Sequence, residues 1–254
     1  MVKKLKAAIF TFTSCFGCSF ELLNMKNELL KLFDKLEFLK FNLIGRNEYS
    51  KHYDIAFIEG SISTKKEQKR LEEIREKAKF VIALGSCACN GGVNIVKNYR
   101  KNAEKEVYGE NIFESRNVKP LDEFIRVDYF VNGCPFSHQE LLEVIDAIIN
   151  NKIFQPKTSS VCSECKLKLK GECLLTKGEI CLGPITRAGC NAICTSNKRP
   201  CHGCRGLAPD ANISAYIKML KLKFKLSDEE IKKLLEPYGF LEHLEVKNNG
   251  NKDR

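Results

Sequence analysis

Thirteen cysteines constrain this chain of 254 residues more than any other feature of its sequence. Eight of them lie between residues 158 and 206, in a segment with little apolar periodicity. Such a segment cannot fold around a hydrocarbon core of its own, and a bound metal cluster can supply the missing folding energy. We therefore expect metal to organise the C-terminal part of the chain.

The cellular compartment decides how cysteines are interpreted, because thiols stay reduced in the cytoplasm and pair as disulfides outside it. No apolar stretch is long enough to cross a bilayer, and the apolar run Ala7–Phe12 is too short for a secretory signal. We expect a cytoplasmic protein with no membrane partner. In that compartment thirteen cysteines predict metal binding rather than a disulfide framework.

The charge balance raises the question of nucleic acid. Lysine and arginine outnumber aspartate and glutamate by 42 to 32, which gives a net charge of +10. A four-iron core held by four thiolates carries about −2, so three clusters would offset about six positive charges. Few aromatic residues lie among the lysines of segment 218–225, as a nucleic-acid surface would require. We therefore expect no nucleic-acid partner.

The first 155 residues alternate apolar runs with amphipathic segments, a pattern typical of a parallel sheet wrapped by helices. Strands are expected at Leu5–Phe12, Leu36–Leu43, Ile55–Glu59, Phe80–Leu84 and Tyr129–Val131, and helices at 19–33, 64–78 and 137–150. Several of these strands are apolar without alternation, as strands covered on both faces should be. We predict an α/β fold with a flavodoxin-like parallel sheet over residues 1–155.

The character of the sequence changes after Pro156. A small, irregular cysteine-rich domain is expected over residues 156–246, followed by a polar tail over 247–254. Two helices are predicted near its end, one at 212–224 and one capped by Ser227.

The first group of cysteines follows predicted strand ends. Cys15 and Cys18 come after the first strand, Cys87 after the fourth and Cys134 after the fifth. Open parallel sheets bind their ligands at this edge, and nearby glycines would let the backbone approach a bulky inorganic core. Single buried cysteines are common, but three strand ends that each carry cysteine near glycine favour a metal site. Cys89 is not needed for four ligands, and we interpret it as structural.

The second group contains eight thiols, enough for two four-cysteine sites. Its members are Cys162, Cys165, Cys173, Cys181, Cys190, Cys194, Cys201 and Cys204. A zinc ribbon built from the two Cys-x-x-Cys pairs is an alternative. That alternative leaves four of the eight cysteines unused, and spacing alone leaves both interpretations open.

Several motifs in combination resemble the small subunit of nickel–iron hydrogenases. They are Cys15-Phe16-Gly17-Cys18, Glu59-Gly60-Ser61-Ile62, Gly85-Ser86-Cys87-Ala88, Gly133-Cys134-Pro135, the block from Cys181 to Cys190, and Pro200-Cys201-His202-Gly203-Cys204. The resemblance spans about residues 5–220. It is strongest to the cytoplasmic multi-subunit branch, which includes sulfhydrogenase delta subunits and the small subunits of viologen-reducing and deazaflavin-reducing enzymes.

The resemblance implies three [4Fe-4S] clusters and divides twelve cysteines among them. The proximal set is Cys15, Cys18, Cys87 and Cys134; the medial set is Cys190, Cys194, Cys201 and Cys204; the distal set is Cys162, Cys165, Cys173 and Cys181. Cys162 and Cys194 stand where many periplasmic relatives carry a histidine and a proline, so both outer clusters are expected to be all-cysteine. Glu59 and Ser61 are expected to shape the proximal site or a subunit interface.

The function implied by the resemblance is electron transfer in a dihydrogen-cleaving oxidoreductase. The chain would have no catalytic residue of its own, because the nickel–iron centre lies in a separate large subunit. Electrons would pass between that centre and an acceptor subunit that holds flavin or iron–sulfur clusters.

Two other functions remain as alternatives. One is a subunit related to respiratory complex I or to a membrane-bound hydrogenase, which would carry only the proximal cluster. The other is a zinc-binding nucleic-acid module, suggested by the positive charge.

Overall fold

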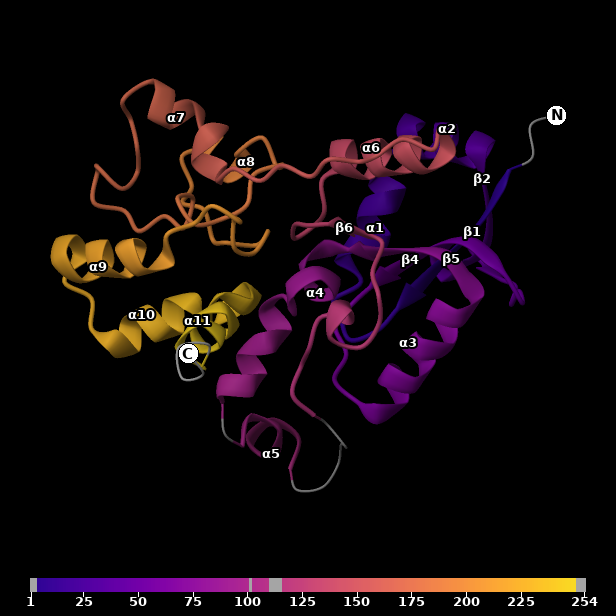
Figure 1. Cartoon of the computed structure of the whole chain (residues 1–254), viewed down its shortest axis with the longest axis horizontal. Helices are drawn as coiled ribbons and strands as arrows, with labels where there is room; N and C mark the ends of the chain where they lie inside the picture. The colour runs from indigo at the N-terminus through magenta and orange to yellow at the C-terminus, as the bar shows by residue number, and fades with distance from the viewer. Residues whose placement is uncertain (1–3, 101, 110–115, 250–254) are drawn as a thin grey trace. The chain divides into compact units, whose positions relative to one another are not determined.

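The computed structural model describes residues 4–100, 102–109 and 116–249. The chain divides into two compact units, Met1–Asp146 (unit 1) and Ala147–Arg254 (unit 2) (Figure 1). Unit 1 contains the sheet, and unit 2 contains eight of the thirteen cysteines. The predicted division into one cluster over residues 1–155 and two over 156–246 stays a prediction.

Unit 1 is built on a six-stranded sheet with the order β3-β2-β1-β4-β5-β6. The strands are β1 (Leu5–Thr11), β2 (Leu36–Phe41), β3 (Arg46–Asn47), β4 (Tyr53–Glu59), β5 (Ala78–Leu84) and β6 (Tyr129–Val131). All neighbours pair parallel except β3, which pairs antiparallel with β2. Without β3, the strand order is that of flavodoxin-like sheets. The predicted α/β fold class is confirmed.

Helices lie on both faces of this sheet (Figure 1). Helix α3 (Lys65–Lys77) is on one face, and α1 (Gly17–Asn24), α2 (Asn27–Lys35) and α6 (His138–Ile149) are on the other. The shorter helices are η1 (Asn42–Ile44), α4 (Gly85–Asn90), η2 (Val93–Tyr99), α5 (Ala103–Tyr108) and η3 (Leu121–Glu123). Helix α3 begins where its capping signal predicts, since the Thr64 side chain accepts a hydrogen bond from the Glu67 N–H at 3.1 Å.

The structure of unit 1 differs from the local predictions in three places. The single helix expected over 19–33 is two helices, because Lys26 takes a left-handed φ of 51° and interrupts the backbone ladder. The third strand was missed because its two residues are too few to carry a periodic signal. The second strand ends at Phe41 rather than Leu43, since η1 turns the chain onto Gly45 with φ 72°.

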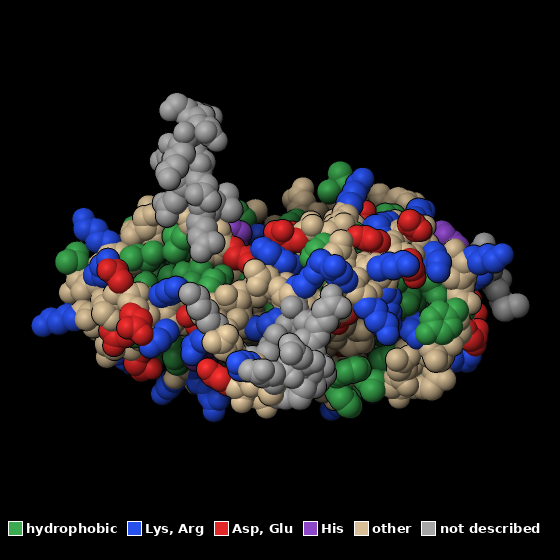
Figure 2. All heavy atoms as spheres, turned by 90° about the horizontal axis from the view of Figure 1, so that it is seen from below, with side chains coloured by type: hydrophobic (Ala, Val, Ile, Leu, Met, Phe, Trp, Pro, Cys, Tyr) green, Lys and Arg blue, Asp and Glu red, His purple; other side chains and the backbone are tan. Residues whose placement is uncertain are grey.

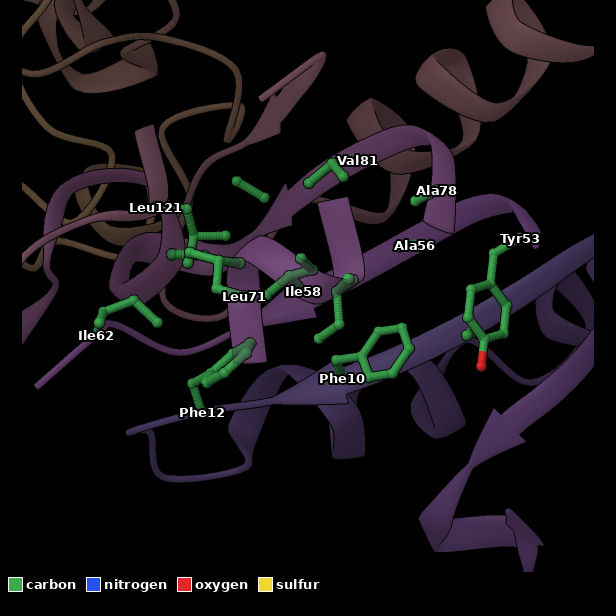
Figure 3. Packing of buried hydrophobic residues seen from close by; sticks show 14 residues of the cluster. Phe10, Phe12, Tyr53, Ala56, Ile58, Ile62, Leu71, Ala78, Val81 and Leu121 are labelled. Atoms are coloured by element: carbon green, nitrogen blue, oxygen red, sulfur yellow. The ribbon is translucent and has the colours of Figure 1, made fainter. Parts of the chain in front are cut away.

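Apolar residues from three neighbouring strands and α3 pack into the core shown in Figure 3. Phe10 of β1, Ile58 of β4 and Leu71 of α3 are all almost completely buried. Burial of this kind stabilises a fold by about 25 cal/mol for each Å² of apolar surface. The core therefore holds the strands in register and sets the relative positions of their carboxyl ends.

Unit 2 has short helices and long connecting segments. Its helices are η4 (Val161–Ser163), α7 (Lys166–Leu169), α8 (Ile193–Ser196), α9 (Ile213–Phe224), α10 (Asp228–Leu235), η5 (Pro237–Gly239) and α11 (Phe240–Asn249). A small core combines Val161, Leu167 and Leu174 with several cysteines. The helix capped by Ser227 is confirmed, with a reciprocal capping box to Glu230. Helix α11 runs three residues into the predicted tail, and residues 250–254 lie outside the described part.

Surface charge and helix length bear on the expected partners. In the described part of the chain, no helix is both long and apolar enough to cross a membrane. Figure 2 shows lysine and arginine side chains interspersed with acidic and uncharged ones on one face of the molecule. On that face they do not gather into a single stripe.

Candidate metal centres

The four thiols of the proximal set converge at the carboxyl edge of the sheet. Cys15 follows β1, Cys18 lies in α1, Cys87 lies in α4 after β5, and Cys134 follows β6. Electrostatic interactions join Cys87 to both Cys134 and Cys15, and join Cys18 to Cys87 and Cys134. Strand order thus brings together cysteines that are up to 119 positions apart in the sequence.

Burial makes these thiols poor acids unless a cation binds them. The effect concerns Cys18, Cys87 and Cys134: burial, followed by the charges of Cys134 and Cys15, raises the pKa of the Cys87 thiol to about 12. Burial and the charge of Glu59 also raise the pKa values of Cys18 and Cys134. A cationic iron core would compensate both burial and mutual repulsion, because metal ligands must be thiolates.

Glycine leaves room for the sulfur atoms at two positions. A Cβ at Gly85 would lie 2.2 Å from the Cys18 Sγ, and one at Gly92 would lie 2.7 Å from the Cys87 Sγ. Both glycines also have positive φ angles, 82° and 61°. Four convergent thiols beside backbone without side chains fit a bulky four-iron core.

Glu59, at the end of β4, is 2% exposed and binds the start of α1. Its carboxylate accepts hydrogen bonds from the N–H groups of Cys18 at 3.1 Å and Ser19 at 3.0 Å. The Ser19 hydroxyl donates a third, at 2.5 Å. A carboxylate at the N-terminal end of a helix accepts hydrogen bonds from free N–H groups and interacts favourably with the helix dipole. Glu59 therefore holds the turn of helix that carries Cys18.

Ser61 is fully buried and pairs with the strand end that leads to Cys15. The Ser61 N–H donates to the Thr13 carbonyl at 2.9 Å, and the Thr13 N–H donates to the Ser61 carbonyl at 3.2 Å. Glu59 and Ser61 thus hold successive parts of one cysteine-bearing segment.

Asn94 is a site residue that the sequence reasoning missed. Its Nδ2 donates to the Cys87 Sγ at 3.7 Å, and is held by the Thr13 carbonyl at 3.0 Å and the Ser61 Oγ at 3.2 Å. Hydrogen bonds to cluster-ligating sulfur tune the reduction potential of a cluster. An asparagine in an irregular segment carries no sequence signal for such a contact.

Cys89 lies apart from the proximal set. Its thiol donates to the Ala83 carbonyl at 3.4 Å, and its side chain packs against the hydrophobic core. This placement is consistent with its interpretation as a structural residue.

The predicted distal set also comes together, within unit 2. Cys162 interacts electrostatically with Cys181, Cys165 and Cys173, and Cys181 interacts with Cys173 and Cys165. Burial, followed by the charge of Cys181, raises the pKa of Cys162 to about 11. Gly183 supplies backbone without a side chain beside the Sγ atoms of Cys162 and Cys181.

The structure brings the predicted medial set together only in part, and one member contacts the predicted distal set, since the Cys201 N–H donates to the Cys181 Sγ at 3.2 Å. The Cys194 carbonyl accepts from the Arg199 N–H at 3.0 Å, so the segment that leads to Cys201 lies beside α8. Burial raises the pKa of Cys201 to about 12, with further contributions from the charges of Cys181 and then Cys204. Cys190 lies beside Arg205 and Glu164. The division between medial and distal ligands stays a prediction.

Within residues 4–100, 102–109 and 116–249, no group of three or more histidine, cysteine, aspartate or glutamate side chains is placed to hold one metal ion.

The comparisons with known proteins agree on one family. The family described as NADH ubiquinone oxidoreductase, 20 Kd subunit, matches residues 15–148. Sulfhydrogenase 2 subunit delta of Pyrococcus furiosus is 35% identical over 238 residues, which cover 92% of this chain and 99% of that protein. A vhu subunit of the F420-non-reducing hydrogenase of Methanocaldococcus jannaschii is 32% identical over 234 residues, which cover 79% of this chain and 81% of that protein.

A solved structure extends the fold comparison over both units. The Actinobacterial-type NiFe-hydrogenase from Ralstonia eutropha H16 has a chain that matches with a TM-score of 0.60 and 14% identity, covering 99% of this chain and 92% of that one. At that identity the likeness concerns the fold, while the sequence relatives establish the kinship. The chain belongs to the NADH ubiquinone oxidoreductase 20 Kd subunit family, as a small subunit of the hydrogenase type.

Proposed function

We propose that this chain is the electron-transferring small subunit of a nickel–iron hydrogenase. It relays electrons through three [4Fe-4S] clusters between the nickel–iron site of a large subunit and an acceptor subunit that holds flavin or iron–sulfur clusters. The observation that carries the proposal is the convergence of Cys15, Cys18, Cys87 and Cys134 at one edge of the sheet. We further propose that the complex works in the cytoplasm, where these thiols stay reduced.

The chain's own residues would prepare each site for electron transfer. When bound, a four-iron cluster supplies reversible one-electron chemistry. Glu59 and Ser61 hold the segment that carries Cys15 and Cys18, while Asn94 donates toward the Cys87 sulfur. Burial of Cys18 and Cys87 keeps water from the sulfur ligands and lowers the local dielectric.

The eight cysteines of unit 2 favour three clusters over one. A subunit with only the proximal cluster would not need the four distal cysteines to lie together, nor a further buried thiol such as that of Cys201. The sulfhydrogenase relative matches 92% of this chain, a span that must include part of the cysteine-rich segment. This extended match supports the hydrogenase interpretation over a single-cluster subunit.

Metal analysis tests the proposal directly. We expect the chain, prepared anaerobically and separated from its partners, to contain about twelve iron atoms and twelve labile sulfides. The chain alone should reduce no dye with dihydrogen, because its cysteines are committed to clusters. About four iron atoms per chain would support the single-cluster alternative, and zinc without iron or sulfide would support the zinc module.

An apolar rim beside the proximal set fits the large-subunit interface. Phe16 is 43% exposed, Phe20 is 55% exposed and Val93 is 52% exposed. Phe16 adjoins Cys15, Phe20 lies one turn further along α1, and Val93 follows the glycine that contacts Cys87. Each of the three lies close in sequence to a proximal cysteine, and exposed apolar side chains are typical of protein interfaces.

Phe20→Asp is therefore expected to weaken binding of the large subunit by tenfold or more, since it would bury a carboxylate in that interface. Copurification and the apparent Kd of the pair measure the effect. Leu30→Asp is the control, because Leu30 on α2 is 63% exposed and lies outside the rim. Equal weakening by both substitutions would contradict this location of the interface.

A further inference from the structure

Arg205 is a charged side chain with almost no exposure to solvent. It is 1% exposed and heads the fully buried side chains by volume. A guanidinium stays protonated in proteins, so its charge must be balanced where it lies. A buried charge without compensation would cost several kcal/mol, on the order of its lost hydration. The groups around Arg205 therefore indicate the charge of the group that unit 2 would bind.

The position of Arg205 is set by contacts with the two residues that precede Cys190. Its Nε donates to the Ala188 carbonyl at 2.9 Å. A Cβ at Gly189 would lie only 2.4 Å from its Nη2 and 2.9 Å from its Cζ, so glycine leaves the space that the guanidinium fills. The guanidinium thus lies against the backbone that leads to Cys190, and Arg205 itself comes directly after Cys204, a second medial cysteine.

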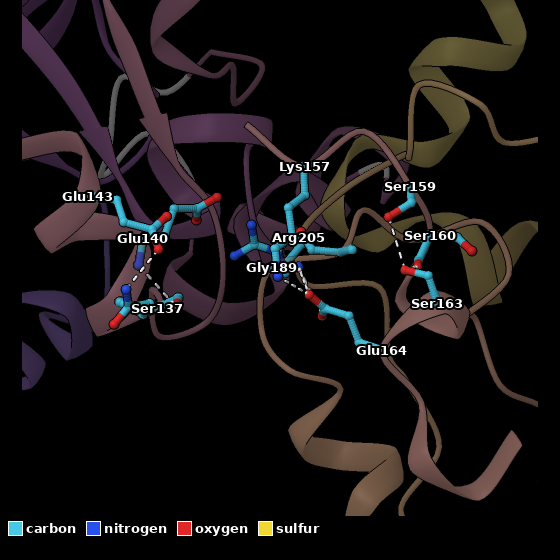
Figure 4. Close-up of polar contacts among 12 residues, drawn as sticks. Ser137, Glu140, Glu143, Lys157, Ser159, Ser160, Ser163, Glu164, Gly189 and Arg205 are labelled. Atoms are coloured by element: carbon cyan, nitrogen blue, oxygen red, sulfur yellow. Dashed lines mark hydrogen bonds and ion pairs between the residues drawn. The ribbon is translucent and has the colours of Figure 1, made fainter. Parts of the chain in front are cut away.

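Glu164 is the acidic group beside this arginine (Figure 4). It is already bound by other donors, since Lys157 Nζ lies 2.6 Å from its Oε1 and the Gly189 N–H donates to both oxygens at 3.0 and 3.1 Å. These donors, an ammonium and a backbone N–H, fit a charged carboxylate, which can only accept hydrogen bonds. Lys157, Glu164 and Arg205 together carry a charge of +1.

Within the medial set, the charge of Arg205 acts on Cys190, and the charge of Glu164 acts on the same cysteine with the opposite sign. Arg205 also directly follows Cys204 in the chain. A four-thiolate [4Fe-4S] cluster carries about −2 when oxidised and about −3 when reduced. A buried cation beside it would stabilise the more negative, reduced state, because charges interact strongly where water is excluded.

The geometry points to Arg205 as a positioning residue that raises the reduction potential of the medial cluster. The inference rests on the proposed function, because it requires a cluster on Cys190, Cys194, Cys201 and Cys204. The proximal set provides a contrast within unit 1, where the buried charge beside the thiols is the carboxylate of Glu59. A negative neighbour lowers a potential and a positive neighbour raises it, so the medial cluster accepts electrons more readily than the proximal one.

The test measures the potential of each cluster by electron paramagnetic resonance during redox titration of the whole complex. The medial signal is identified as the one altered in Cys194→Ser. In Arg205→Gln that signal should titrate at a more negative potential, with the other two unchanged, whereas Arg205→Lys should stay near the native value. Glu164→Gln should shift the medial potential in the opposite direction. Arg199→Gln is the control, since Arg199 is exposed near Cys201 and solvent screens its charge.

Each outcome decides the inference. Opposite shifts in Arg205→Gln and Glu164→Gln support it. Three intact clusters with unshifted medial potential in both variants overturn it and leave the proposed function standing. If Arg205→Gln loses the medial cluster, the medial potential in Glu164→Gln becomes the test. An unshifted medial potential in Glu164→Gln would then overturn the inference, because Arg205 would have a structural role alone. A native complex without a medial signal overturns both the inference and the three-cluster proposal.

Discussion

Replacing Cys87 with serine is expected to abolish the proximal cluster and, with it, electron transfer from dihydrogen. Cys87 interacts electrostatically with Cys134 and Cys15 and receives the amide donor of Asn94. Three thiolates and a hydroxyl hold a buried iron core poorly, because serine is a much weaker acid and a harder ligand. Iron content should fall from about twelve to about eight atoms per chain. Metal analysis, with dihydrogen-dependent dye reduction by the complex, measures both effects.

Cys89→Ser is the matched control two positions away. The Cys89 thiol donates to the Ala83 carbonyl and packs against the core of the sheet. Its replacement should cost about 0.5–3 kcal/mol of stability, within the usual range for one substitution, and leave iron content unchanged. Loss of the proximal signal in Cys89→Ser, with retention in Cys87→Ser, would overturn the ligand assignment.

Gly85→Ala is expected to have an effect as large without removing any ligand. The new Cβ would lie 2.2 Å from the Cys18 Sγ, far inside contact distance, at a φ of 82° that side chains avoid. The Cys18 sulfur would have to move away from its place beside Cys87 and Cys134. We expect loss of the proximal signal and of dihydrogen-linked dye reduction. Electron paramagnetic resonance of the reduced complex records the first, and a dye assay the second.

Gly45→Ala separates backbone strain from the steric clash. Gly45 has a similar φ of 72°, but nothing lies within 4 Å of the Cβ that alanine would add. A left-handed alanine should cost about 1–3 kcal/mol at either site. Thermal unfolding should therefore detect both substitutions, while only Gly85→Ala removes the cluster. Loss of the proximal signal in Gly45→Ala as well would point to general destabilisation.

The sequence by itself determined the sheet and marked the cysteines as candidate metal ligands. Strands buried on both faces leave uninterrupted apolar runs, so the five parallel strands could be placed to within a few residues. Helices with side-chain caps were equally predictable, since Thr64 and Ser227 accept hydrogen bonds from N–H groups three residues later. Each of these signals is local, because it depends on residues within a few positions of one another.

Local patterns were insufficient where tertiary contacts override them. The break at Lys26 and the strand Arg46–Asn47 lack any periodic signal. Glu59 could be recognised as a candidate, but its part in holding α1 depends on Thr11 pairing with Glu59 across β1 and β4. That register is set by the packed core.

Only the tertiary structure decided what surrounds the thiols. Asn94 reaches the Thr13 carbonyl across 81 positions of sequence, and Arg205 reaches the Ala188 carbonyl across 17. Cysteine spacing marks candidate ligands, while their division into sets rests on the resemblance to hydrogenase small subunits. The groups that tune those thiols come from elements that meet only after the chain has folded, since packing and hydrogen bonding, rather than periodicity, bring them together.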